Sequence, residues 1–144
     1  MTIQIETNVD DMDPRLWPVV IDQVLAAGAL DVWVTPIIMK KGRPAFTLSA
    51  LCEPDAATNV RNAIFRETTT IGIRETSVER HVLDREIVEV EVLGQRIRLK
   101  IASIDGQVIN TSVEWDDVVA ASNAVGMSAK DVLAAATAAA VRDD

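Results

Sequence analysis

The sequence predicts an α+β fold: a ferredoxin-like βαββαβ sandwich over residues 1–80, followed by a β-hairpin and a C-terminal helical hairpin over residues 81–144. The first observation is the order strand, helix, strand, strand, helix, strand in the hydrophobic periodicity of the first part. The second is an alternating stretch around Gly94, followed by two helical stretches, the last of them rich in alanine. Because no low-complexity linker separates the two parts, we expect a single domain, residues 1–144.

The first strand and helix are indicated by a change of period. Residues 2–6 alternate isoleucine with polar residues, which is typical of a strand. Asp13 is suited to cap the following helix, and Pro14 to occupy its first position. Gly28 marks the expected end of this helix. Pro18 removes one backbone hydrogen bond, so the regular helix is expected to start late.

The rest of the sandwich is predicted as a hairpin, a helix and a strand. Residues 32–52 form the hairpin, with residues 40–44 as its turn. Pro36 indicates an edge strand or a bulge, because proline cannot donate to a neighbouring strand. A second helix of about fifteen residues opens at Glu53-Pro54-Asp55, and residues 70–78 supply the fourth strand.

The second part of the chain carries its own turn and cap signals. The hairpin turns at Gly94, with strands on either side of it. Thr111-x-x-Glu114 predicts a capping box for a helix that stops at Gly126. Ser128-x-x-Asp131 predicts the cap of a last, alanine-rich helix, and residues 142–144 are expected to fray.

Composition excludes several classes of protein. The formal net charge is −8, which argues against nucleic-acid binding because that requires a broad basic surface. The longest apolar stretches are too short to span a bilayer, and no signal peptide is expected at the start. Cys52 is the single cysteine, which permits no internal disulfide and suits a reducing cytoplasm.

The basic turn Lys40-Lys41-Gly42-Arg43 is the strongest functional signal. The chain has only four lysines, and two of them are adjacent here. Three cations around a glycine repel one another unless an anion lies nearby, and Lys and Arg are the usual partners of phosphate and carboxylate groups. The pattern therefore indicates either an anionic ligand or a simple solvated turn.

Two polar clusters elsewhere in the chain have candidate functions. The run Thr68-Thr69-Thr70 with Arg74 can hydrogen-bond phosphate oxygens, although threonines are also ordinary strand residues. Asp10 and Asp11 follow the first strand and are oxygen ligands suited to Mg²⁺ or Mn²⁺, particularly an ion that carries phosphates. They suit the start of a helix equally well. A nickel, copper or zinc site is not expected, because His81 is the only histidine.

Several of these segments together resemble one family. The runs Glu6–Met12, Ala27–Trp33, Thr35–Pro44 and Arg66–Arg74 are similar to the C-terminal domain of LarC, in the same order. LarC is the nickel-insertion protein, or chelatase, that completes the nickel-pincer nucleotide cofactor of lactate racemase. The resemblance is looser after about residue 85, where Val113–Asp117 looks like the family's Pro-Glu-Tyr-Glu-Asp stretch.

The resemblance implies part of a CTP-dependent nickel chelatase of the lyase class, which inserts nickel into pyridinium-3,5-bisthiocarboxylate mononucleotide. CTP with Mn²⁺ or Mg²⁺ is then the expected cofactor, and nickel is a substrate ion that this chain alone does not bind tightly. The nucleotide phosphates are expected to bind to the basic turn and to the threonine run with Arg74, and the metal ion to the aspartates. The expected nucleotide-binding residues are Lys40, Lys41, Arg43, Thr68, Thr69, Thr70 and Arg74, and the expected metal ligands are Asp10 and Asp11.

The resemblance also bears on partners. Family members carry a longer N-terminal domain with a histidine-rich stretch. We therefore expect this chain to be the nucleotide half of the enzyme: a separately encoded subunit with a histidine-rich partner subunit, a fragment, or a stand-alone relative with altered function. A homo-oligomer is also expected. Nucleotide and pyridinium mononucleotide are the expected ligands, and neither nucleic acid nor membrane is an expected partner. Two alternatives stay open on the residues: a non-catalytic oligomerising interaction module, and a ferredoxin-like sensor of another anionic metabolite.

Overall fold

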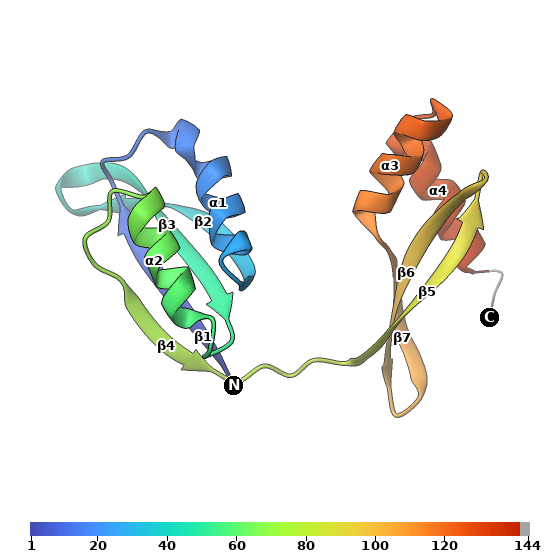
Figure 1. Cartoon of the computed structure of the whole chain (residues 1–144), viewed down its shortest axis with the longest axis horizontal. Helices are drawn as coiled ribbons and strands as arrows, with labels where there is room; N and C mark the ends of the chain where they lie inside the picture. Colours follow the sequence, from blue (N-terminus) through green and yellow to red (C-terminus); the bar gives the residue numbers. More distant parts are fainter. Residues whose placement is uncertain (142–144) are drawn as a thin grey trace. The chain divides into compact units, whose positions relative to one another are not determined.

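A computed structural model describes residues 1–141 of the chain. The chain divides into two compact units, Met1–Arg80 and His81–Asp144, each with its own sheet and its own pair of helices (Figure 1). The boundary after Arg80 falls where the sequence separates the predicted sandwich from the C-terminal part.

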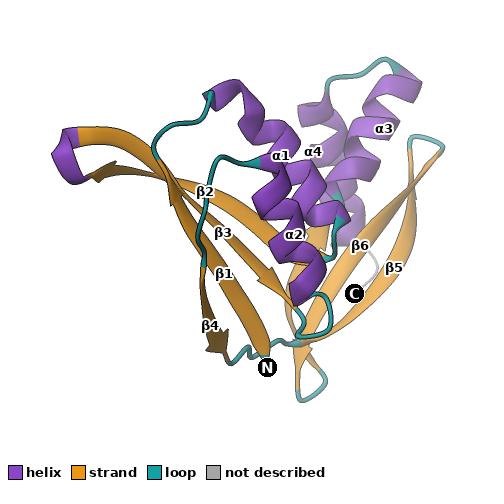
Figure 2. Cartoon of the chain, turned by 60° about the vertical axis from the view of Figure 1, so that its left-hand side comes forward, coloured by secondary structure: helices purple, strands orange, loops and turns teal. Residues whose placement is uncertain are grey.

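The first unit is the predicted ferredoxin-like sandwich. Its sheet has the strand order β2-β3-β1-β4, and every neighbouring pair is antiparallel. Helices α1 and α2 both lie on one face of this sheet (Figure 2). The elements in chain order are β1 (Thr2–Val9), the short 3₁₀ helix η1 (Pro14–Leu16), α1 (Trp17–Ala26), β2 (Ala29–Met39), the 3₁₀ turn η2 (Lys40–Gly42), β3 (Arg43–Cys52), α2 (Ala57–Glu67) and β4 (Arg74–Val78).

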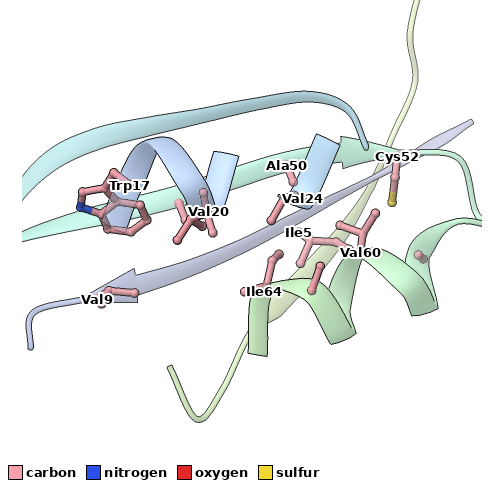
Figure 3. Packing of buried hydrophobic residues seen from close by; sticks show 12 residues of the cluster. Ile5, Val9, Trp17, Val20, Val24, Ala50, Cys52, Val60 and Ile64 are labelled. Carbon is pink, nitrogen blue, oxygen red and sulfur yellow. The ribbon is translucent and has the colours of Figure 1, made fainter. Parts of the chain in front are cut away.

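The core of this unit lies between the sheet and the two helices (Figure 3). Ile5 of β1 is fully buried, as are Leu48 of β3 and Ile64 of α2. Burial of each such side chain stabilises the fold by roughly 1.5–3 kcal/mol. Trp17 closes one end of the core, with its ring 5.6 Å from that of Phe46 in an edge-to-face arrangement.

The first unit follows the prediction at its first helix and differs from it in the bounds of β4 and α2. The Asp13 carboxylate accepts from the Arg15 N–H at 2.9 Å, so it caps η1, and the regular helix α1 begins late, as expected from Pro18. The predicted strand at residues 70–78 is wrong in its first half, because β4 begins only at Arg74. Helix α2 begins at Ala57 and has 11 residues, fewer than the sequence indicated.

Pro36 lies in β2, an edge strand, which confirms the sequence-based expectation. In an edge strand, a proline whose nitrogen faces away from the neighbouring strand costs no hydrogen bond to it. The basic turn directly follows β2 and joins it to β3, so it lies at the end of these two strands, beside one corner of the sheet.

The second unit is a three-stranded antiparallel sheet with two helices. Its elements are β5 (Asp84–Val92), β6 (Gln95–Ile104), β7 (Gln107–Val113), α3 (Trp115–Val125) and α4 (Ala129–Ala140). The strand order is β5-β6-β7, so β7 extends the predicted hairpin by one strand. Val118 of α3 and Val132 of α4 are fully buried with Ile97 of β6 in a separate core.

The caps of α3 and α4 differ in how well the sequence predicted them. The capping box at Thr111 is wrong, because Thr111 belongs to β7 and α3 starts only at Trp115. Gly126 ends α3 with a φ of 71°, as predicted. The Ser128 hydroxyl accepts from the Asp131 N–H at 3.2 Å, which confirms the second cap.

The expected fraying of residues 142–144 falls outside the described residues. Among the helices of residues 1–141, none has both the length and the apolar character needed to cross a membrane.

Candidate functional site

The loop after β1 connects the two polar segments that the sequence singled out. Arg43 Nη1, at the start of β3, donates to Asp10 Oδ2 at 3.3 Å. Thr69 Oγ1, after α2, donates to Asp11 Oδ1 at 2.5 Å. Two adjacent carboxylates therefore join the basic turn to the threonine run, and all of these residues belong to the first unit.

The basic turn has an unusual backbone. Lys41 has a φ of 64° and Gly42 a φ of 68°, so two consecutive residues adopt the left-handed conformation. For lysine this conformation costs about 1 kcal/mol, and such costs are concentrated at binding sites. Lys40 and Lys41 are exposed, and their side chains form no hydrogen bond or ion pair with any residue in the described range 1–141. Their charges are free to meet an anion.

The three threonines of the run have different positions. Thr68 Oγ1 donates to the Ile64 carbonyl at 2.7 Å and so ends α2. Thr70 Oγ1 lies 2.6 Å from the hydroxyl of the buried Thr7, which in turn donates to the Gly72 carbonyl at 2.8 Å. Because these hydroxyls bond to the backbone and to each other, the segment leaves the strand conformation that the sequence predicted.

Thr69 is the member of the run that faces the aspartates. Its hydroxyl contacts Asp11, whereas those of Thr68 and Thr70 hold the loop in place. Of the three threonines, Thr69 is therefore the one that contacts the aspartates. We call Asp10, Asp11, Arg43 and Thr69 together the aspartate cluster.

Arg74 lies on the face of the sheet opposite the helices. Its Nε donates to Glu6 Oε2 at 3.1 Å and its Nη2 to Asn8 Oδ1 at 3.3 Å. Asn8 Oδ1 also accepts from Thr47 Oγ1 at 2.9 Å, and Glu6 Oε1 accepts from Ser49 Oγ at 2.9 Å. These bonds cross β4, β1 and β3, so they order Arg74 within a network of side chains.

Glu6 is the centre of that network. Partial burial raises the pKa of its carboxyl, but hydrogen bonds from Ser49 and Gln4 and the charge of Arg74 outweigh burial. The net pKa lies below the ordinary value of 4.5, so Glu6 is ionised at neutral pH.

Sequence reasoning missed Glu6, Thr47 and Ser49 as members of a polar network. The available signal was the period of β1, in which Gln4, Glu6 and Asn8 alternate with buried residues and so share one face. Pairing with Thr47 and Ser49 depends on the register between β1 and β3, which local sequence does not specify.

The donor set fits a hard divalent ion better than a soft one. Asp10 and Asp11 offer carboxylate oxygens, the ligands that Mg²⁺ and Mn²⁺ prefer. Within residues 1–141 no group of three or more His, Cys, Asp or Glu side chains is placed to hold a metal alone. An ion at this cluster would need further oxygen ligands from water or from a phosphate-bearing ligand.

The sequence of this chain is similar to those of nickel insertion proteins. The family model described as nickel insertion protein matches residues 1–133. The pyridinium-3,5-bisthiocarboxylic acid mononucleotide nickel insertion protein of a Nocardioides species is 56% identical over 134 residues, which is 93% of this chain and 34% of that protein. Its namesake from Thermotoga petrophila is 40% identical over 114 residues, or 79% of this chain and 29% of that protein.

Two solved structures also resemble this chain. The apo form of LarC2, described as the C-terminal domain of a cyclometallase involved in the synthesis of the NPN cofactor of lactate racemase, superposes with a TM-score of 0.86 and 31% identity. The match covers 96% of both chains. A protein of Methanopyrus kandleri shares the fold, with a TM-score of 0.65 and 24% identity over 97% of this chain and 86% of that one.

The chain spans about a third of the length of the curated relatives, 34% in the Nocardioides case. Its first 133 residues nevertheless match the family model, and it superposes over nearly its whole length on a C-terminal domain of the same kind. The resemblance to the C-terminal domain of LarC is confirmed, and this chain belongs to the nickel insertion protein family.

Proposed function

We propose that this chain is the CTP-binding part of a nickel chelatase that inserts nickel into pyridinium-3,5-bisthiocarboxylate mononucleotide. The observation that carries the proposal is the aspartate cluster, in which Asp10 and Asp11 lie between the basic turn and the threonine run. The names of the relatives support the substrate and the cofactor pathway. CTP is the more specific part of the proposal, and it comes from the family resemblance.

The cluster is suited to a divalent ion that carries a triphosphate. Lys40 and Lys41 supply unpaired positive charge for the phosphates, and Arg43 adds a guanidinium already directed at Asp10. Asp10 and Asp11 supply carboxylate oxygens for Mn²⁺ or Mg²⁺. The bound ion would neutralise phosphate charge during CTP hydrolysis, and the residues of this chain would bind and orient the triphosphate.

The remaining residues predicted to bind the nucleotide hold neighbouring side chains or loops in place in this proposal. Thr68 and Thr70 hold the loop that presents Thr69, and Arg74 is ordered by Glu6 and Asn8 beside the same end of β1. Thr69 is then the hydroxyl best placed to contact a ligand at Asp11.

Nickel enters this proposal as a substrate ion. The sequence contains one histidine, His81, and one cysteine, Cys52, whose side chain is fully buried. Nickel delivery therefore needs soft ligands from elsewhere, such as a histidine-rich partner, and a homo-oligomer is the proposed assembly. Sedimentation of the chain with and without CTP tests the assembly.

Isothermal titration calorimetry of the chain with CTP tests the proposed function. We expect binding in the presence of Mn²⁺ and at least tenfold weaker binding after its removal with a chelator, a difference of about 1.4 kcal/mol. The same titration with ATP, GTP and UTP separates a CTP site from a sensor of other anionic metabolites. Absence of binding at millimolar CTP with Mn²⁺ contradicts the proposal.

A further inference from the structure

The face of the first sheet that the helices leave open carries a row of side chains across all four strands. Trp33 of β2 is the register partner of Ser49 in β3, Ser49 is that of Glu6 in β1, and Glu6 is that of Arg74 in β4. Figure 2 shows that α1 and α2 cover one face of this sheet. Directly opposite residues of antiparallel strands share a face, and the hydrophobic residues that alternate with these four pack in the core, so the four side chains lie side by side on the other face. We call this set the open-face row.

The row is ordered by hydrogen bonds along most of its length. Ser49, only 1% exposed, donates to Glu6, and Arg74 donates to the other oxygen of the same carboxylate. The Glu6 side chain is 26% exposed and that of Arg74 53% exposed, so both remain reachable from solvent. A carboxylate and a guanidinium are therefore held in fixed positions before any ligand arrives, which reduces the entropy lost on binding.

The chemical groups follow one another in a defined order. From β2 to β4 the row offers an aromatic ring, a hydroxyl, a negative charge and a positive charge over about 14 Å, from strand spacings of about 4.8 Å. A pyridinium mononucleotide carries groups that complement three of these four: a planar cationic ring, whose quaternary nitrogen bears the positive charge, and an anionic phosphate joined to the ring through ribose. An indole attracts a cationic ring, a carboxylate attracts the ring nitrogen, and a guanidinium binds phosphate.

We propose that the open-face row binds the pyridinium mononucleotide, with the ring on Trp33, the ring nitrogen near Glu6 and the phosphate on Arg74. The inference rests on the proposed function, because it places the substrate of that reaction. It assigns the mononucleotide to the open face of the sheet, and CTP with its ion to the aspartate cluster at the end of β1. The two ligands would then lie on neighbouring parts of one unit, which is the arrangement that a reaction involving both requires.

Nicotinic acid mononucleotide is a suitable probe, because it has a pyridinium ring, a ring carboxylate and the same ribose phosphate. Uridine monophosphate is the matched control ligand, since its ring is uncharged. Calorimetry on the full chain is expected to show the pyridinium compound binding at least fivefold more tightly. Trp33→Ala and Glu6→Gln are each expected to weaken that binding by about five- to tenfold, and Trp33→Phe to restore part of the loss.

Two controls separate this inference from the proposed function. Trp115→Ala removes an exposed tryptophan of the second unit and is expected to leave the affinity for nicotinic acid mononucleotide unchanged. Trp33→Ala is expected to bind CTP with Mn²⁺ as the wild type does, because Trp33 lies outside the aspartate cluster. Thermal melting of each variant identifies any that fail to fold.

Two results would overturn the inference. The first is equal affinity of the wild type for the two mononucleotides, or no binding of either below roughly 10 mM. The second is unchanged affinity in folded Trp33→Ala; a changed sedimentation coefficient in that variant would then identify the open face as an interface between copies of the chain. Loss of CTP binding in the wild type, with the pyridinium compound still bound, would instead contradict the proposed function.

Discussion

Thr69 Oγ1 donates a hydrogen bond to Asp11 Oδ1 across 2.5 Å, although the two residues are 58 positions apart in the sequence. The contact brings the loop after α2 to the loop after β1. Asp10, the neighbour of Asp11, makes the corresponding contact with Arg43 at the start of β3. The aspartate pair is thus the point at which three separate parts of the sequence meet within one unit.

Replacement of both Lys40 and Lys41 by alanine is expected to weaken CTP–Mn²⁺ binding at least tenfold. The two lysines carry the unpaired charge of the turn, and neither packs in the core of the described residues, so the melting temperature should stay within about one degree. Calorimetry and thermal melting measure the two effects. Lys100→Ala with Lys130→Ala removes the same charge from the second unit and should leave binding intact; if both pairs act alike, net charge alone is responsible.

Thr69→Val is expected to lower CTP–Mn²⁺ affinity by about five- to tenfold, in line with the loss of one hydrogen bond of about 1 kcal/mol. Valine keeps the shape of the side chain but leaves Asp11 without its hydroxyl donor. Calorimetry measures the affinity, and Thr76→Val, an exposed substitution in β4, serves as the control. An unchanged affinity in Thr69→Val would remove Thr69 from the site.

Thr7→Val is expected to destabilise the first unit by about 1 kcal/mol, because the buried hydroxyl bonds to Thr70 and to the Gly72 carbonyl. Urea unfolding followed by the fluorescence of Trp17 and Trp33 measures the loss. Thr2→Val is the matched control, since Thr2 is equally buried but its hydroxyl makes only one long bond, 3.4 Å to Val78. Equal effects of the two substitutions would mean that the Thr7 bonds do not anchor the loop.

Asp117 is expected to make the second unit sensitive to acid. Hydrogen bonds from the side chain and backbone of Arg98 lower the pKa of its carboxyl from 3.8 to about 2. A lowered folded-state pKa gives stability that is complete above about pH 4 and is lost as the pH falls towards 2.

Thermal melting of wild type and Asp117→Asn, followed by Trp115 fluorescence, checks this expectation. The wild type should melt a few degrees higher at pH 6, and the two curves should converge near pH 2. Asp116→Asn is the control, because within residues 1–141 the Asp116 side chain forms no ion pair. A difference between wild type and Asp117→Asn that is independent of pH would contradict the Arg98–Asp117 pairing.

Periodicity located most elements of the fold but failed where side chains compete with the backbone. Gly126 and Ser128 ended and began helices as predicted, because their conformational and hydrogen-bonding preferences act locally. Thr70 was expected in a strand and lies in a loop, because its hydroxyl is bound by Thr7 of β1. A residue that is distant in the sequence decided that outcome.

In the candidate site, too, the sequence indicates the residue types and the tertiary structure decides which residues meet. The sequence marked the lysines, the threonine run and the aspartates by residue type, but it did not indicate which of them meet. Register between β1, β3 and β4 placed Glu6 against Ser49 and Arg74, and so brought residues of ordinary strand composition into one network.

The sequence by itself determined the ferredoxin-like order of elements, the family and the charged residue types at the basic turn, since periodicity, turn chemistry and motif similarity are all local properties of the chain. Only the tertiary structure decided that Asp10 and Asp11 face Arg43 and Thr69, and that Trp33, Ser49, Glu6 and Arg74 form one row. The reason is physical: contacts between distant segments depend on strand register and loop anchoring, and these are set by packing of the whole unit.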